Sequence, residues 1–107
     1  MTKKERFLKQ LEEERQNIKK GLDEIGLKTF ASEMLLHSFT SFNEEKRNVL
    51  LVLNILKYCE RLSCELVEKG YNIDISKDEK DYNKETILFC ELCALSRNIR
   101  YNLTFDF

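Results

Sequence analysis

The sequence predicts an all-α protein: one domain over residues 1–107, built as a four-helix, bundle-like fold. The chain of 107 residues contains no proline and three glycines, a composition typical of long helices joined by short turns. Apolar residues recur at three- and four-residue spacings in four separate segments. Hydrophobic residues make up 42% of the chain, which is enough for a single core.

The longest and most apolar of these segments runs from Asn43 to Gly70. Its apolar residues cover more than half of a helical wheel, so we expect the other elements to be arranged around this helix and to cover it on two or three sides. Asn43, or Ser41 with Glu44 three residues later, supplies a start signal, and Lys69-Gly70 supplies a stop. The apolar set is Val49, Leu51, Val52, Leu53, Ile55, Leu56, Tyr58, Cys59, Leu62, Leu66 and Val67.

The first predicted helix begins at a capping box formed by Thr2 and Glu5 and ends at Gly26. Its narrow apolar stripe indicates that it packs on one side only, either across the helix of residues 43–70 or against its twin in a dimer. Gly21, in its interior, weakens it by about 1 kcal/mol relative to alanine. The stripe consists of Leu8, Leu11, Ile18, Leu22 and Ile25.

A second, shorter helix is expected from Thr29 to Phe39, with Thr29 as its cap. His37, the only histidine, lies at the edge of its apolar arc, one turn after Glu33. No second histidine and no nucleophile motif accompanies it. We therefore interpret His37 as a partly buried side chain paired with Glu33.

Two segments, 71–75 and 101–107, alternate between apolar and polar residues with a period of two. We expect either that they pair as a two-stranded ribbon supported by the helices, or that the C-terminal aromatic side chains dock individually. The last helix starts between Ser76 and Asn83 and ends near Arg100. Its inner seam is Leu88, Leu92, Leu95 and Ile99, and its other faces carry Ile87, Phe89, Cys90, Cys93, Ala94 and Tyr101.

Four cysteines, Cys59, Cys64, Cys90 and Cys93, lie on the two most apolar helices. Four thiolates would suit zinc, but Cys59 and Cys64 point about 140° apart on an ideal helix. Free cysteine usually behaves as a small buried hydrophobe. We interpret all four as reduced core thiols, with zinc binding as the alternative.

The segment from Asp74 to Glu85 resembles an EF-hand calcium loop, with Asp74, Ser76, Asp78 and Glu85 at its first, third, fifth and twelfth positions. Glu79 stands where the sharp turn of such a loop needs glycine. A capping box of Ser76 and Glu79 within a solvated charge run is the simpler interpretation. Calcium binding is the alternative.

Glu60 is a carboxylate surrounded by apolar positions on its helical wheel. We expect it to meet Arg15 or Lys4 of the first helix, a cation of a partner protein, or solvent at the rim of the core. The sequence shows no second acid–base group beside it, no glycine-rich phosphate loop and no serine nucleophile elbow. We predict no catalytic residue, no cofactor, no metal ligand and no enzymatic activity.

The charges of the chain nearly cancel, with 18 basic and 19 acidic residues and a net charge of -1. This balance lacks the concentrated basic footprint of a nucleic-acid-binding protein. The longest apolar run, 49–53, is far shorter than the ~20 residues of a membrane span, and no apolar signal core follows the N-terminal lysines. We expect a cytoplasmic protein that does not enter a membrane.

Two helices, 43–70 and the last one, are apolar on more than one side, and a four-helix domain of this size has difficulty covering both. We therefore expect a protein partner and a homodimer, and predict a protein-binding module that acts by stoichiometric association as an inhibitor, adaptor or regulator. In size, helical content and lack of catalytic motifs the chain is similar to the small helical proteins with which phages and mobile elements block host enzymes, including anti-CRISPR proteins. This similarity is one of type, without a shared motif.

The alternative function is that of a helical DNA-binding transcriptional regulator, chiefly through the lysines and arginines of the first helix. A helix-turn-helix would have to lie within residues 29–56. Its recognition helix would open with Glu44 and Glu45, which phosphates repel. Nucleic-acid binding therefore ranks below protein binding.

Overall fold

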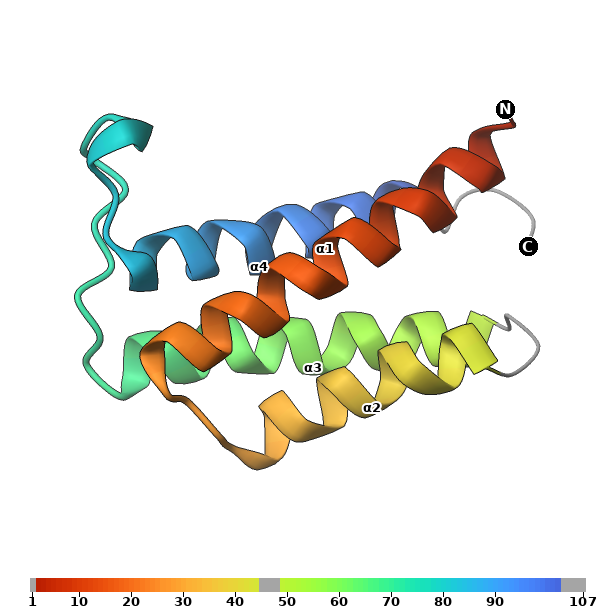
Figure 1. The fold of residues 1–107 in the computed structure, drawn as a ribbon, viewed down its shortest axis with the longest axis horizontal. Helices are drawn as coiled ribbons and strands as arrows, with labels where there is room; N and C mark the ends of the chain where they lie inside the picture. The colour runs from red at the N-terminus through yellow and green to blue at the C-terminus, as the bar shows by residue number, and fades with distance from the viewer. Residues whose placement is uncertain (1, 45–48, 103–107) are drawn as a thin grey trace.

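The computed structural model describes residues 2–44 and 49–102, and this part of the chain forms four helices in an up-down-up-down arrangement (Figure 1). The predicted all-α, four-helix fold is confirmed. The molecule spans 37 × 29 × 19 Å. The helices are α1 (Lys3–Ile25), α2 (Phe30–Glu44), α3 (Val49–Glu68) and α4 (Lys84–Asn102), and a short 3-10 helix, η1 (Glu79–Asp81), precedes α4.

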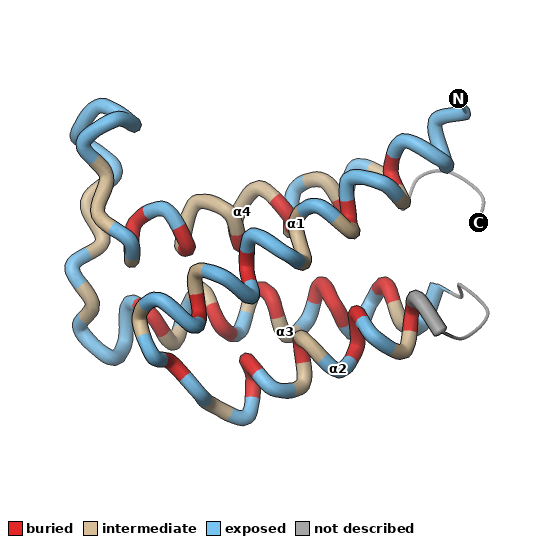
Figure 2. The backbone as a smooth tube through the Cα atoms, viewed as in Figure 1, coloured by how far each residue is buried: buried red, intermediate tan, exposed pale blue. Residues whose placement is uncertain are grey.

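Each helix packs against two others, in the cyclic order α1, α2, α3, α4. Buried residues lie on the sides of the helices that face the interior of the bundle (Figure 2). α3 is covered by α2 and α4, as its wide apolar surface predicted, but α1 lies diagonally across from it. The predictions that α3 is central and that α1 packs across it are therefore wrong. The narrow stripe of α1 instead fills the gap between α4 and α2.

The termini of α1 follow the predicted signals. Thr2 caps the helix, its hydroxyl oxygen accepting a hydrogen bond from the Glu5 N–H at 3.1 Å. Gly26 adopts a left-handed conformation with φ of 67°, and the N–H of Leu27 donates to the carbonyl of Leu22 at 3.1 Å. This bond satisfies a carbonyl that the end of the helix would otherwise leave unpaired.

α2 begins as predicted and ends later. The hydroxyl oxygen of Thr29 accepts from the Ser32 N–H at 3.2 Å, which caps the helix. The helix then continues past Phe39 to Glu44, because Phe42, only 2% exposed, extends the buried stripe by one more turn.

The polar residues near position 43 therefore do not start α3. Ser41 and Asn43 lie inside α2, and α3 begins at Val49; residues 45–48 lie outside the described part of the chain. His37 is exposed on α2, so its interpretation as a partly buried partner of Glu33 is wrong. The predicted stop at Gly70, whose φ is 79°, is confirmed.

Residues 71–83 connect α3 to α4 without forming a strand, so the predicted ribbon is not formed by residues 71–75. Tyr101 and Asn102 form the end of α4, and 103–107 lie outside the described residues. The backbone of the connection is instead held by α4. The Asn72 carbonyl accepts from Thr86 Oγ1 at 3.3 Å and from Asn83 Nδ2 at 2.8 Å.

All four helices supply the core. The predicted α4 seam is confirmed, since each of its four residues is fully buried. The connection between α1 and α2 adds Leu27. The buried apolar residues described are Phe7, Leu11, Ile18, Leu22, Leu27, Ala31, Leu35, Phe39, Phe42, Val52, Ile55, Leu56, Cys59, Leu62, Leu66, Leu88, Leu92, Leu95 and Ile99.

Candidate functional site: the outer face of α4

The outer side of α4 carries a second apolar stripe, opposite the buried seam. Its residues are spaced three, four, three and four positions apart, so they share one face of the helix. We name Ile87, Cys90, Ala94, Arg97 and Tyr101 the α4 face. Ile87 is 44% exposed and Tyr101 is 68% exposed, and Cys90 and Ala94 are half-buried. Apart from Arg97, the stripe consists of apolar or aromatic residues directed towards solvent.

A shallow groove of about 570 Å³ runs along the α3 side of the α4 face. The connection between α3 and α4 closes one end, where the Tyr82 hydroxyl donates to the Ile75 carbonyl at 3.1 Å. The Ile75 side chain is 61% exposed. The groove is lined by Glu60, Ser63, Ile75, Tyr82, Phe89, Cys90, Cys93, Ser96 and Arg97.

A second groove of about 510 Å³ runs along the other side, between α4 and α1. It contains two half-buried carboxylates whose pKa values are raised. Burial is the main cause for both; Glu13 adds to the effect on Glu14, and Glu14 and Glu24 add to the effect on Glu91. The groove is lined by Glu14, Asn17, Glu79, Tyr82, Ile87, Cys90, Glu91, Ala94 and Arg97.

Cys90 lines a groove that also contains the side chains of Glu79 and Arg97. Burial is the main reason that the pKa of its thiol is raised; the carboxylate of Glu79 raises it further and the guanidinium of Arg97 lowers it. Neither Glu79 nor Arg97 forms an ion pair with another residue described in the structure. Both side chains are exposed, and they carry opposite charges.

The four cysteines do not share one environment. Cys59 is a core thiol, as predicted: its Sγ donates to the Leu92 carbonyl at 3.0 Å, and burial raises its pKa to about 12. Cys64 is exposed, so the core interpretation is wrong there, and Cys90 and Cys93 are half-buried. All four are free thiols, and within residues 2–44 and 49–102 no three Cys, His, Asp or Glu residues form a metal-binding group.

The segment from Asp74 to Glu85, which resembles a calcium loop, does not bring three acidic side chains together as a metal-binding group. The Asp74 carboxylate accepts a hydrogen bond from the Ser76 N–H at 3.0 Å, and hydrogen bonds from Ser76 lower the pKa of Asp74. Ser76 therefore does not cap a helix, and the predicted capping box with Glu79 is wrong. The cap of α4 is Asn83, whose Oδ1 accepts from the Thr86 N–H at 2.8 Å.

Glu60 is half-buried at the rim of the core, which was one of the predicted alternatives, and it meets a cation that was not predicted. Its carboxylate accepts from the guanidinium of Arg100 on α4. Arg15 instead pairs within α1 with Glu12, at 2.7 Å. The expected contact with α1 fails because α3 and α1 lie on a diagonal of the bundle.

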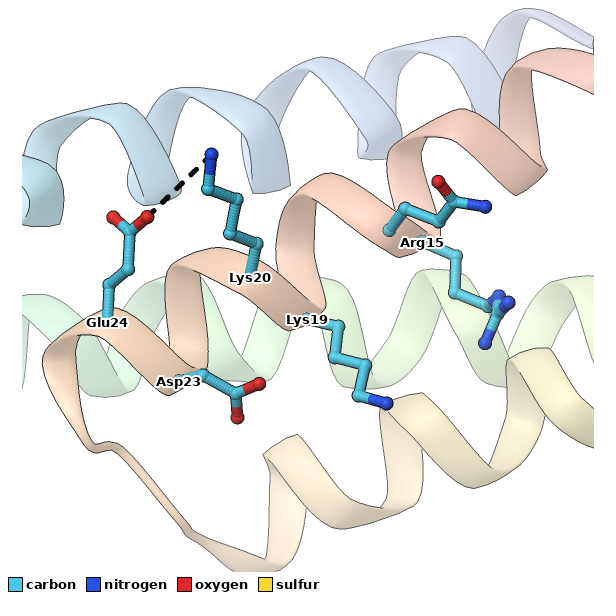
Figure 3. Close-up of a pocket in the computed structure, with 6 residues that line it drawn as sticks. Arg15, Lys19, Lys20, Asp23 and Glu24 are labelled. Carbon is cyan, nitrogen blue, oxygen red and sulfur yellow. Dashed lines mark ion pairs between the residues drawn. The ribbon is translucent and has the colours of Figure 1, made fainter.

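Three of the basic residues named in the alternative DNA-binding prediction, Arg15, Lys19 and Lys20, extend from the outer surface of α1 (Figure 3). Lys20 pairs with Glu24 at 3.9 Å, and Asp23 lies among the same side chains. Arg15 and Lys19 extend to one side of α1 and Lys20 to the other (Figure 3). This surface is mixed in charge and its cations do not converge.

No protein-family model matches the chain, and no curated protein or solved structure matches it. The candidate site therefore depends on the geometry alone. Among the helices described, none is both long and apolar enough to span a membrane.

Sequence reasoning recognised the apolar residues of the α4 face as lying outside the buried seam. It did not single out Arg97 or Tyr82, and it assigned Glu79 to a capping box rather than to this face. The three- and four-residue spacing that runs from Ile87 through Arg97 to Tyr101 was the available signal for Arg97. Glu79 and Tyr82 had no such signal, because the fold of the connection, rather than helical periodicity, places them beside α4.

Proposed function

We propose that this protein is a non-enzymatic protein-binding module that acts by stoichiometric association, and that the α4 face is its docking surface. The supporting observation is that Ile87, Ala94 and Tyr101 lie on the outer side of α4 while its inner seam already fills the core. Clustered apolar groups rimmed by charged residues mark protein interaction sites.

The shape of the face suits a helix of the partner. The α4 face is a ridge with a groove on each side, and ridges of one helix pack into grooves beside another at interaxial distances of about 8–10 Å. Cys90 and Ala94 are small, so a second helix can approach the middle of the ridge closely. An amphipathic helix would place its apolar side chains in the two grooves.

Exposed apolar residues also occur on α3, where Val49, Leu50 and Leu53 face solvent at the start of the helix. The two grooves described above lie beside α4, where they can hold the side chains of a partner. We therefore assign docking to α4. Inhibitors, adaptors and regulators that work without chemistry, including the phage-encoded class named above, need only such a surface.

A capture experiment tests this proposal. The tagged wild-type chain and an Ala94→Glu variant are incubated with extract of the native host, and any retained protein is purified and titrated against each chain by calorimetry. Thr40→Glu is the matched control, because it adds the same charge at an exposed position on α2, which does not pack against α4. We expect stoichiometric binding to the wild type and to Thr40→Glu, and at least tenfold weaker binding to Ala94→Glu.

Equal binding by all three chains, or the lack of any specific partner, would refute the proposal. The salt dependence of the retained complex separates it from a DNA-binding regulator. An apolar protein interface responds weakly to salt, whereas binding to nucleic acid weakens steeply as salt rises.

A further inference from the structure

We propose that Cys90 and Cys93 of α4 form a binding site for a soft monovalent cation, copper(I), with their two thiolates as the protein ligands and Arg97 balancing the charge. The starting observation is that both thiols line the groove on the α3 side of α4. This inference goes beyond the proposed function and does not depend on it, because it is tested on the isolated chain.

The two cysteines occupy positions from which one metal ion can reach both sulfur atoms. They are three residues apart within α4, so they lie one turn apart on the same side of the helix, with Cβ atoms about 5–6 Å from each other. Both are free thiols, and both are half-buried in the groove wall. The helix sets their spacing before an ion arrives, so binding requires side-chain rotation rather than refolding of the backbone.

The donor set of the groove selects a soft ion with a low coordination number. Thiolates favour copper(I) and zinc, but a structural zinc site needs four ligands in a tetrahedron. Among the described residues that line the groove, no other carries a sulfur atom or an imidazole. No third Cys, His, Asp or Glu within residues 2–44 and 49–102 joins the pair in a metal-binding group. Copper(I) forms linear complexes with two thiolates, so it is the ion whose coordination this pair can complete.

The charges around the pair favour the complex that would form. Binding makes two copper–sulfur bonds and releases both thiol protons, so the copper(I) bis-thiolate carries one negative charge. Arg97 follows Cys93 by four residues and Cys90 by seven, which places all three on one side of α4, and it lines the same groove. The carboxylate of Glu60, in the same lining, is already paired with Arg100. The guanidinium of Arg97 can therefore balance the charge of the complex.

The surroundings of the pair protect both the free thiols and a bound ion. Burial is the main reason that the pKa of the Cys93 thiol is raised; Cys90 raises it further and Arg97 lowers it. A protonated thiol reacts more slowly with oxidants than a thiolate does, so the pair stays reduced and available for metal. Phe89 and Ile75 line the same groove, and apolar groups around a metal site limit the access of water to the ion.

Anaerobic competition for copper(I) tests the site. The reduced wild-type chain, Cys90→Ser, Cys93→Ser and Cys64→Ser are checked for folding by circular dichroism and titrated against the coloured complex of copper(I) with bicinchoninate. Cys64→Ser is the matched control, because Cys64 is an exposed thiol of α3 outside the lining of the groove. We expect equimolar binding by the wild type and by Cys64→Ser. Each of the other two variants should bind roughly 100-fold more weakly, since even outer-shell partners of a metal contribute about 10–100-fold.

Two further measurements complete the test. Arg97→Gln should bind copper(I) several-fold more weakly and Arg97→Lys should bind like the wild type, because the charge is what balances the complex; equal affinity in Arg97→Gln would refute this role. X-ray absorption of the copper-loaded wild type, which needs no variant, should show two sulfur neighbours. A wild type that does not compete for copper(I), unchanged binding by Cys90→Ser or Cys93→Ser, loss of binding by Cys64→Ser, or three or more sulfur neighbours would overturn the inference.

Discussion

The contact between α1 and α4 can be tested at Gly21, where helix propensity and packing predict opposite results. A Cβ added at Gly21 would lie 3.0 Å from Leu88 Cδ1 and 3.4 Å from Leu88 Cβ. Propensity alone favours alanine by about 1 kcal/mol. Leu88 is fully buried, so its methyl group must displace core neighbours, and such overpacking costs about 1–3 kcal/mol. The difference between these terms is about 0–2 kcal/mol, so we expect Gly21→Ala to lower the free energy of unfolding by about 1 kcal/mol.

Urea denaturation of a double-mutant cycle isolates the packing term. In a Leu88→Ala background the offending methyl group is gone, so Gly21→Ala should now raise stability by about 1 kcal/mol. Leu88→Ala itself costs about 2–5 kcal/mol, and the cycle is therefore measured in a stabilising sulfate buffer. Gly21→Ala could instead raise the stability of the wild-type chain by the same amount as that of the Leu88→Ala variant. That result would refute the close contact between Gly21 and Leu88.

Three further predictions concern buried or half-buried polar groups of α4 and its cap. Thr86→Val should lower the free energy of unfolding by about 1–2 kcal/mol, because the Asp74 N–H loses the hydroxyl acceptor that lies 3.1 Å away; Thr86→Ser, which keeps the hydroxyl, should recover most of this in the same denaturant titration. Asn83→Ala should cost about 1 kcal/mol through loss of the α4 cap, measured by thermal unfolding. Glu91→Gln should stabilise the protein at pH 7. Burial raises the pKa of Glu91 in the folded state, so its carboxyl group favours folding below the unfolded pKa and loses that contribution as pH rises through the folded pKa. The advantage of Glu91→Gln over the wild type should therefore shrink as the pH is lowered through that range, and a constant difference would contradict the reasoning.

The helices were predictable because their signals are local. Thr2 and Gly26 limit α1, and Asn83 begins α4 through contacts within a few residues. The end of α2 was missed because polar residues after position 40 imitate a helix start, whereas burial of Phe42 in the core keeps the chain helical. That burial is a tertiary contact, which a local pattern does not report.

The pairing of helices was less predictable than their existence. An apolar stripe shows which side of a helix is covered but not by which neighbour. Gly21 illustrates the difference: in the sequence it weakens α1, and in the structure it is the point where Leu88 of α4 comes closest. The observed partner of Glu60 differs from the predicted one for the same reason. Arg100 belongs to the helix adjacent to α3, whereas Arg15 belongs to the helix diagonally across from it.

The candidate site combines a helix face, which the sequence pattern predicts, with the connection between α3 and α4, whose fold the sequence pattern does not predict. Tyr82 and Glu79 reach the α4 face only because residues 71–83 are fastened to the first turn of α4, where the Thr86 hydroxyl accepts from the Asp74 N–H and lies 3.3 Å from the Asn72 carbonyl. The position of Glu79 therefore depends on the connection, and that of Arg97 depends on α4 itself. Loosening the connection at Thr86 should therefore weaken binding at the α4 face even where α4 itself is intact, because Tyr82 and Glu79 line the grooves beside it.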